Sequence, residues 1–154
     1  MNARNSLFLR DSVVTVAVLV GLYGLAFGLQ FQPLQIPGYL LIVGFDLIEV
    51  AFGSAGANYD LLFGVYLVAL GVGAAALAGV LRAVSRRTDL PHWRLGAAGA
   101  LAIVGTLSLL FALRVLLVST QRTPVLVTGL AGITLIALAA WLSGLFEVNV
   151  RPAR

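Results

Sequence analysis

Residues 61–81 read LLFGVYLVALGVGAAALAGVL, a run of apolar and small residues without a single charged side chain. At a rise of about 1.5 Å per residue, a helix of this length crosses the roughly 30 Å hydrocarbon layer of a bilayer. Inside lipid the backbone must satisfy its own hydrogen bonds, and one continuous segment does so as an α-helix. The stretch therefore predicts a transmembrane helix.

Three further segments of the same character lie at about 12–30, 95–118 and 125–146. None shows the alternation of polar and apolar residues that marks the strands of a membrane barrel. Only 10% of the chain is charged and 60% is hydrophobic, whereas soluble domains carry roughly 25% charged residues. We therefore expect residues 1–154 to form one all-α membrane domain, a polytopic integral membrane protein built as a four-transmembrane-helix bundle.

The segment at about 37–53, between the first two spans, is apolar but carries Asp46 near its middle. A charge at mid-membrane costs about 2.5–3.5 kcal/mol on insertion scales, and a fifth span would move the following arginine-rich loop to the outside. We therefore expect an extra external helix, interfacial or re-entrant, with Pro37 in its first turn and Gly53 at its C-terminal stop. A short β-hairpin is the alternative that its Val, Ile and Phe content leaves open.

The distribution of arginine predicts the orientation, because cytoplasmic loops carry an excess of basic residues. If the N-terminus is inside, the external side holds one arginine, Arg122. The cytoplasmic side then holds eight, which are Arg4, Arg10, Arg82, Arg86, Arg87, Arg94, Arg151 and Arg154. The first apolar run is longer than a signal-peptide core and no A-x-A-like site closes it, so we expect a retained span. The predicted location is the cell membrane, or the equivalent membrane of a virion, with both termini cytoplasmic. The expected cytoplasmic anchor is the loop carrying Arg82, Arg86, Arg87 and Arg94.

Four charged residues form a candidate polar site at the external mouth of the bundle. Arg114 lies within the third span, where a cation requires a partner or has to extend toward the headgroups. Its possible partners are Asp46, Glu49 and Asp60. The alternatives are that Arg114 simply reaches the lipid phosphates, that Asp46 and Glu49 form the wet face of an interfacial helix, and that Asp60 caps the second span.

Glycines at helical spacing predict close helix contacts, because small residues let membrane helices approach each other. The expected packing positions are Gly21, Gly24 and Gly28 on the first span and Gly73 and Gly79 on the second. Glycine is also common in membrane helices without such a role. The sequence leaves open whether the contacts form within the chain or between copies.

Two internal alignments raise the hypothesis of a duplication. The first and third spans align at an offset of 84, and the second and fourth at an offset of 65. Helices rich in Leu, Ala and Gly also match by chance, so both explanations stay open.

The composition excludes several kinds of chemistry. The chain has no cysteine and one histidine, His92, which rules out disulfides, iron–sulfur clusters and a bis-histidine haem within one chain. No nucleophile elbow, zinc-protease motif, phosphate-binding loop or dinucleotide fingerprint occurs. We expect no enzyme activity, no cofactor, no metal site and no nucleic-acid partner, with the lipid bilayer as the first partner.

Two functional classes remain, together with a weaker sensor or lipid-binding role for the external helix. The preferred one is a structural or accessory subunit that acts through helix–helix contacts with other membrane subunits or with copies of itself. The alternative is a small oligomeric transporter or channel. Transporters usually carry ionisable groups at mid-depth, and here the polar residues expected there are hydroxyls such as Thr106 and Ser108.

Overall fold

The computed structural model describes residues 3–28, 30–84 and 90–145, and within them the secondary structure consists of helices joined by short connections, without a strand. The elements are α1 (Ala3–Gly28), α2 (Gln32–Phe52), the 3-10 turn η1 (Gly56–Asn58), α3 (Tyr59–Val84), α4 (His92–Val118) and α5 (Arg122–Leu142). The all-α prediction is thus confirmed for this part of the chain. Five helices there are long and apolar enough to cross a membrane, one more than the spans assigned from sequence.

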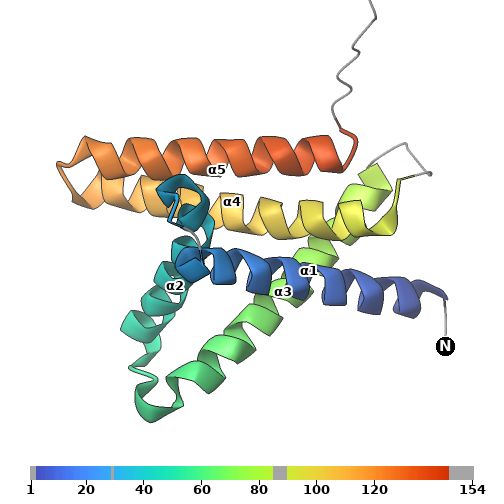
Figure 1. Ribbon diagram of the computed structural model, residues 1–154, viewed down its shortest axis with the longest axis horizontal. Helices are drawn as coiled ribbons and strands as arrows, with labels where there is room; N and C mark the ends of the chain where they lie inside the picture. The colour runs from blue at the N-terminus through green and yellow to red at the C-terminus, as the bar shows by residue number, and fades with distance from the viewer. Residues whose placement is uncertain (1–2, 29, 85–89, 146–154) are drawn as a thin grey trace, which may run out of the picture.

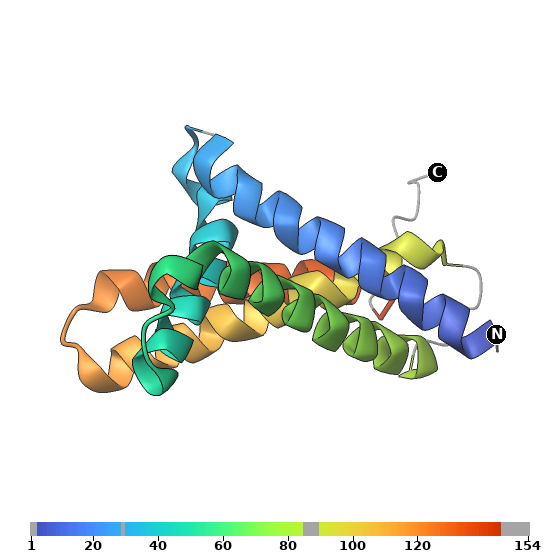
Figure 2. The ribbon, with the colours of Figure 1, turned by 90° about the horizontal axis from the view of Figure 1, so that it is seen from below.

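The helix that sequence analysis placed outside the bundle differs from the others in direction. α1, α4 and α5 follow the long axis of the molecule, α3 runs obliquely to it, and α2 runs across it (Figures 1 and 2). α1 and α4 begin at one end, where α3 and α5 finish; we call this the proximal end and the opposite one the distal end. α1 and α3 both pack on α4, and α5 packs mainly on α4.

Two residues determine the boundaries of α2, a proline in its first turn and a glycine at its C-terminal end. Pro33 stands in the first turn, where its missing N–H would have no partner anyway. Pro37, which the sequence placed in that turn, instead lies inside the helix because α2 begins at Gln32. Gly53 ends α2 as predicted, with φ of 105° and its N–H donating to the Glu49 carbonyl. The hairpin alternative does not form.

The other boundaries differ from the predicted spans at several ends. α1 begins at Ala3 and α5 stops at Leu142. The predicted limit at residue 30 falls in the bend before α2, and the one at residue 146 lies outside the described residues. η1 runs directly into α3, so Asp60 stands in the first turn of α3 rather than at its cap. In that position the negative charge of Asp60 still interacts favourably with the positive, N-terminal end of the helix dipole.

Glycines allow close approach at contacts among α1, α3, α4 and α5. A Cβ on Gly71 of α3 would collide with α1, and one on Gly99 of α4 would collide with the backbone of α3. Across the α4–α5 contact, a Cβ on Gly132 would lie 2.9 Å from the Gly105 carbonyl oxygen. These three contacts hold the bundle together at short interhelical distance.

α2 is fixed to the bundle by aromatic packing and by α4. Rings from α1, α2 and α3 form one aromatic cluster, which consists of Tyr23, Phe27, Phe45, Tyr59, Phe63 and Tyr66. On its other side α2 borders a small cavity of about 220 Å³, which Gly44 and Leu47 line together with Leu107, Phe111 and Arg114 of α4.

The outer surface of the bundle is rich in large apolar side chains. Phe52 of α2 is 86% exposed and Val118 of α4 is 82% exposed. On α5, Leu126, Leu130 and Ile133 are exposed as well. Such extensive apolar exposure is unusual for a protein in water, where large patches mark interaction surfaces.

The helix pairs compared in the duplication hypothesis pack differently. α4 and α5 lie side by side along their length, whereas α1 and α3 cross (Figure 1). The two pairs therefore do not share one packing arrangement.

Candidate functional site

The most polar buried site lies between α1 and α3 toward the proximal end. Asp11 of α1 is 2% exposed, and its Oδ2 accepts a hydrogen bond of 2.7 Å from Nη2 of Arg82 near the end of α3. The Arg82 side chain keeps 31% of its surface exposed. A buried carboxylate requires such a partner, because burial of an isolated charge is strongly unfavourable.

A second polar link joins the same two helices one turn farther along α1. The Thr15 hydroxyl lies 2.7 Å from the Gly71 carbonyl oxygen of α3 and 2.9 Å from the Ser12 carbonyl oxygen of its own helix. Thr15 is fully buried, and the absence of a side chain on Gly71 lets α1 approach closely enough for this bond. The ion pair and the Thr15 bond together fix how α1 crosses α3.

A groove opens beside the ion pair. It has a volume of about 590 Å³. Its walls come from both helices and consist of Leu7, Phe8, Asp11, Ala75, Ala76, Gly79, Val80, Arg82 and Ala83. The arrangement combines apolar walls with one charged pair.

Sequence reasoning missed Asp11, which it left in the flank of the first span. A signal was present, since Asp11, Thr15 and Leu19 are spaced by four and so fall on one helix face. All three are buried. Polar residues on the apolar stripe of a helix are candidates for interhelical bonds.

The predicted external site is assembled only in part. Asp46, Glu49 and Asp60 all lie near enough to the Tyr59 hydroxyl for their charges to act on it. Glu49 is engaged by its own loop, since its Oε1 accepts hydrogen bonds from the Ala55 N–H at 2.7 Å and the Ser54 hydroxyl at 3.3 Å.

Arg114 is not paired with any of these three carboxylates. Within residues 3–28, 30–84 and 90–145 the ion pair recorded is that of Arg82 with Asp11. Arg114 is exposed on α4 beside the cavity under α2. The arrangement corresponds to the alternative of an arginine that reaches outward.

The predicted packing glycines differ from those that make the contacts. Gly21, Gly24, Gly28 and Gly79 have no atom of a neighbouring helix near the position of a Cβ, and Gly73 would meet only the side-chain end of Ile103, at 3.5 Å. Helix contacts inside the chain therefore do not account for four of the five predicted packing glycines. Their role in contacts outside the chain stays a prediction.

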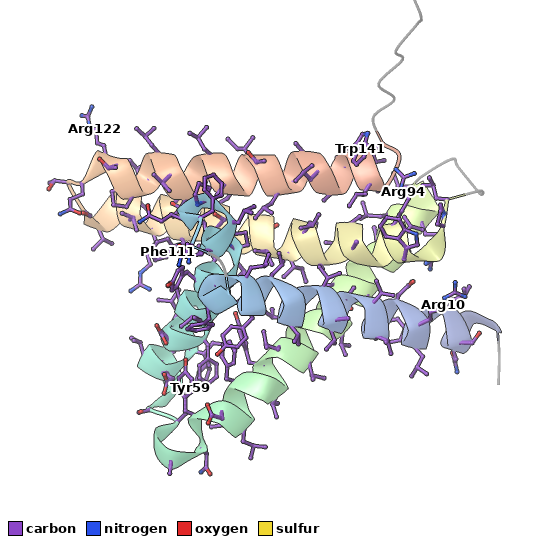
Figure 3. The ribbon with its side chains drawn as sticks, viewed as in Figure 1. Arg10, Tyr59, Arg94, Phe111, Arg122 and Trp141 are labelled. Carbon is purple, nitrogen blue, oxygen red and sulfur yellow. The ribbon has the colours of Figure 1, made fainter. Side chains whose placement is uncertain are left out.

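Of the predicted anchor arginines, Arg82 and Arg94 can be placed, while Arg86 and Arg87 lie outside the described residues. Arg94 lies over the ring of Trp141, 5.7 Å from its centroid, and its Nη2 is 3.5 Å from the Trp141 carbonyl oxygen. Figure 3 shows Arg10, Arg94 and Trp141 toward the proximal end and Arg122 at the distal end.

Comparisons with protein families, with curated proteins and with solved structures found no match to this chain.

Proposed function

We propose that this chain is an integral membrane protein with four transmembrane helices, α1, α3, α4 and α5, and both termini cytoplasmic. The support is the surface: exposed side chains along the helices are largely Leu, Val, Ile and Phe, which lipid solvates and water does not. The proximal end faces the cytoplasm in this proposal. Arg10, Arg94 and Trp141 lie toward that end (Figure 3), as the positive-inside rule and the aromatic belt require.

In the same proposal α2 is a re-entrant helix rather than a fifth span. It runs across the long axis of the bundle (Figures 1 and 2). It also borders α4 around Leu110, which at about 1.5 Å per residue precedes the end of α4 at Val118 by roughly 12 Å. α2 therefore lies below the distal end of α4, at a depth where its apolar side chains contact lipid.

Within the membrane, the proposed role is that of a non-catalytic structural or accessory subunit that binds other helices. One observation carries this proposal: Ala17, Gly21, Gly24 and Gly28 recur at spacings of three and four along α1, and all four are exposed. None of the three glycines has a neighbouring atom within 4 Å of a Cβ position. A face of this kind lets a second helix approach closely, which is a main source of helix association in lipid.

Replacing Gly24 by leucine tests the proposed role. Filling the α1 face is expected to weaken association with the partner helix by about tenfold, because overpacking costs about 1–3 kcal/mol. The measurement is native mass spectrometry of the gently solubilised protein, which reports both copies and foreign subunits. Gly79→Leu is the matched control, since it adds the same side chain to another open helical glycine. A wild-type protein that travels as a lone chain, or a complex unaffected by Gly24→Leu, would refute the proposal.

A small oligomeric transporter is the second candidate, and the buried Asp11–Arg82 pair favours it. Ionisable residues within membrane helices often mark ion pathways. Reconstituted liposomes decide between the two: a flux that Asp11→Asn abolishes supports a transporter, and a stable foreign subunit without flux supports the accessory role.

A further inference from the structure

The groove beside the ion pair has a geometric origin. α1 and α3 are in closest contact where Gly71 meets Val16, and they separate on either side of their crossing (Figure 1). Toward the proximal end the widening gap is bordered by Leu7 and Phe8 on α1 and by small residues on α3. Its volume of about 590 Å³ falls within the roughly 300–1,000 Å³ of typical small-molecule sites.

Arg82 lines this groove, and the described residues use only part of its hydrogen-bonding capacity. A guanidinium group has five N–H donors in a fixed fork, and the bond from Arg82 within the described part of the chain is the one from Nη2 to Asp11. Asp11 is buried while Arg82 keeps 31% of its side chain exposed. The carboxylate therefore holds the guanidinium at the wall of the groove, where part of the Arg82 side chain stays exposed.

We propose that this groove binds one anionic phospholipid, with an acyl chain between α1 and α3 and the headgroup phosphate on Arg82. The proposal rests on the membrane location proposed above, which places the proximal end at the cytoplasmic headgroups. Arginine binds phosphate through two parallel N–H···O bonds. Asp11 is a positioning residue, because it acts on the phosphate only by orienting Arg82.

The shape of the groove favours a lipid over a free phosphate ion. Leu7, Phe8 and Val80 offer nothing to an inorganic anion, whereas each buried methylene of an acyl chain contributes about 0.8 kcal/mol. Gly79 lines the groove and leaves space there, since no atom lies within 4 Å of its Cβ position. The phosphate and the chain thus have separate recognition elements.

The two elements are tested separately by native mass spectrometry of the delipidated full-length protein in detergent. Phosphatidylglycerol and phosphatidylcholine with identical chains are titrated, and inorganic phosphate forms a third arm. We expect the wild type to bind one phosphatidylglycerol at least tenfold more tightly than phosphatidylcholine. Gly79→Leu, which fills the groove and leaves the ion pair intact, is expected to reduce binding of both lipids at least tenfold. Gly24→Leu, on the open face of α1, is expected to leave lipid binding unchanged.

The headgroup element is tested by the double variant Asp11→Asn/Arg82→Gln, which removes both charges without leaving one unpaired. It should lose the preference for phosphatidylglycerol and keep the weaker binding of phosphatidylcholine.

The proposal is overturned by equal affinity of the wild type for the two lipids, by unchanged lipid binding in Gly79→Leu, or by inorganic phosphate binding as tightly as the lipid. A change of oligomeric mass in Gly79→Leu would also overturn it, because the occupant would then be another helix. Recovery of the protein in the membrane fraction without lipid preference refutes this proposal alone, and recovery in the soluble fraction refutes the membrane location as well.

Discussion

Gly99→Ala is expected to lower the free energy of unfolding by about 1–3 kcal/mol, although alanine is the better helix former. A Cβ at this position would overlap the Ala74 carbonyl oxygen and lie 3.2 Å from the Ala78 Cβ. The obstacle is backbone, so no side-chain rotation relieves it. α3 and α4 have to separate, and the contact at the centre of the bundle is lost.

Gly79→Ala provides the matched control for this prediction. Gly79 also lies in a helix but faces open space, so alanine should raise stability by about 0.5–1 kcal/mol through helix propensity alone. The measurement is unfolding in mixed detergent micelles, followed by circular dichroism. Opposite signs for the two substitutions are expected, and a stabilised Gly99→Ala variant would contradict the packing of α3 on α4.

Arg82→Ala is expected to have the largest effect on stability, a loss of about 3–5 kcal/mol, because it leaves the Asp11 carboxylate buried without its partner. The loss of stability comes from leaving the Asp11 carboxylate buried and unpaired, and less from losing the attraction within the ion pair. Replacing both residues by leucine should therefore restore most of the lost stability.

Arg10→Ala is the control for a nearby arginine, since Arg10 is exposed on the same helix as Asp11. It should change the free energy of unfolding by less than about 0.5 kcal/mol, as surface substitutions usually do. The same unfolding measurement compares all variants. If Arg82→Ala and Arg10→Ala were equally mild, the ion pair would not hold α1 to α3.

The sequence predicted the helices well because length and apolar composition are local properties. Residues 61–81 fall inside α3, and the transverse α2 was predicted as a separate helix ended by Gly53. Its start was misplaced, since the pattern around Pro37 resembles a first turn as much as the pattern around Pro33 does. A proline signal alone does not choose between two nearby prolines.

The candidate site was harder to predict because it depends on which helix faces meet. Asp11 lies just before the predicted first span, and only the crossing of α1 with α3 brings it to Arg82. Gly24 and Gly99 are equally small, yet Gly99 is covered by α3 and Gly24 faces open space. Residue type indicates that a close contact is possible, and only the tertiary arrangement determines where it forms.

The location and direction of each helix can be measured with single cysteines, because the chain has none of its own. Cysteine is placed at four exposed positions, two at each end of the bundle. Asn5 in α1 and Ala83 in α3 lie at the proximal end, and Ala57 in η1 and Thr120 between α4 and α5 lie at the distal end. A membrane-impermeant thiol reagent is then applied to intact cells and to inverted membrane vesicles. We predict labelling of Ala57→Cys and Thr120→Cys from outside, and of Asn5→Cys and Ala83→Cys only in inverted vesicles. If Asn5→Cys and Ala83→Cys label from opposite sides, α2 crosses the membrane and the four-span arrangement is wrong.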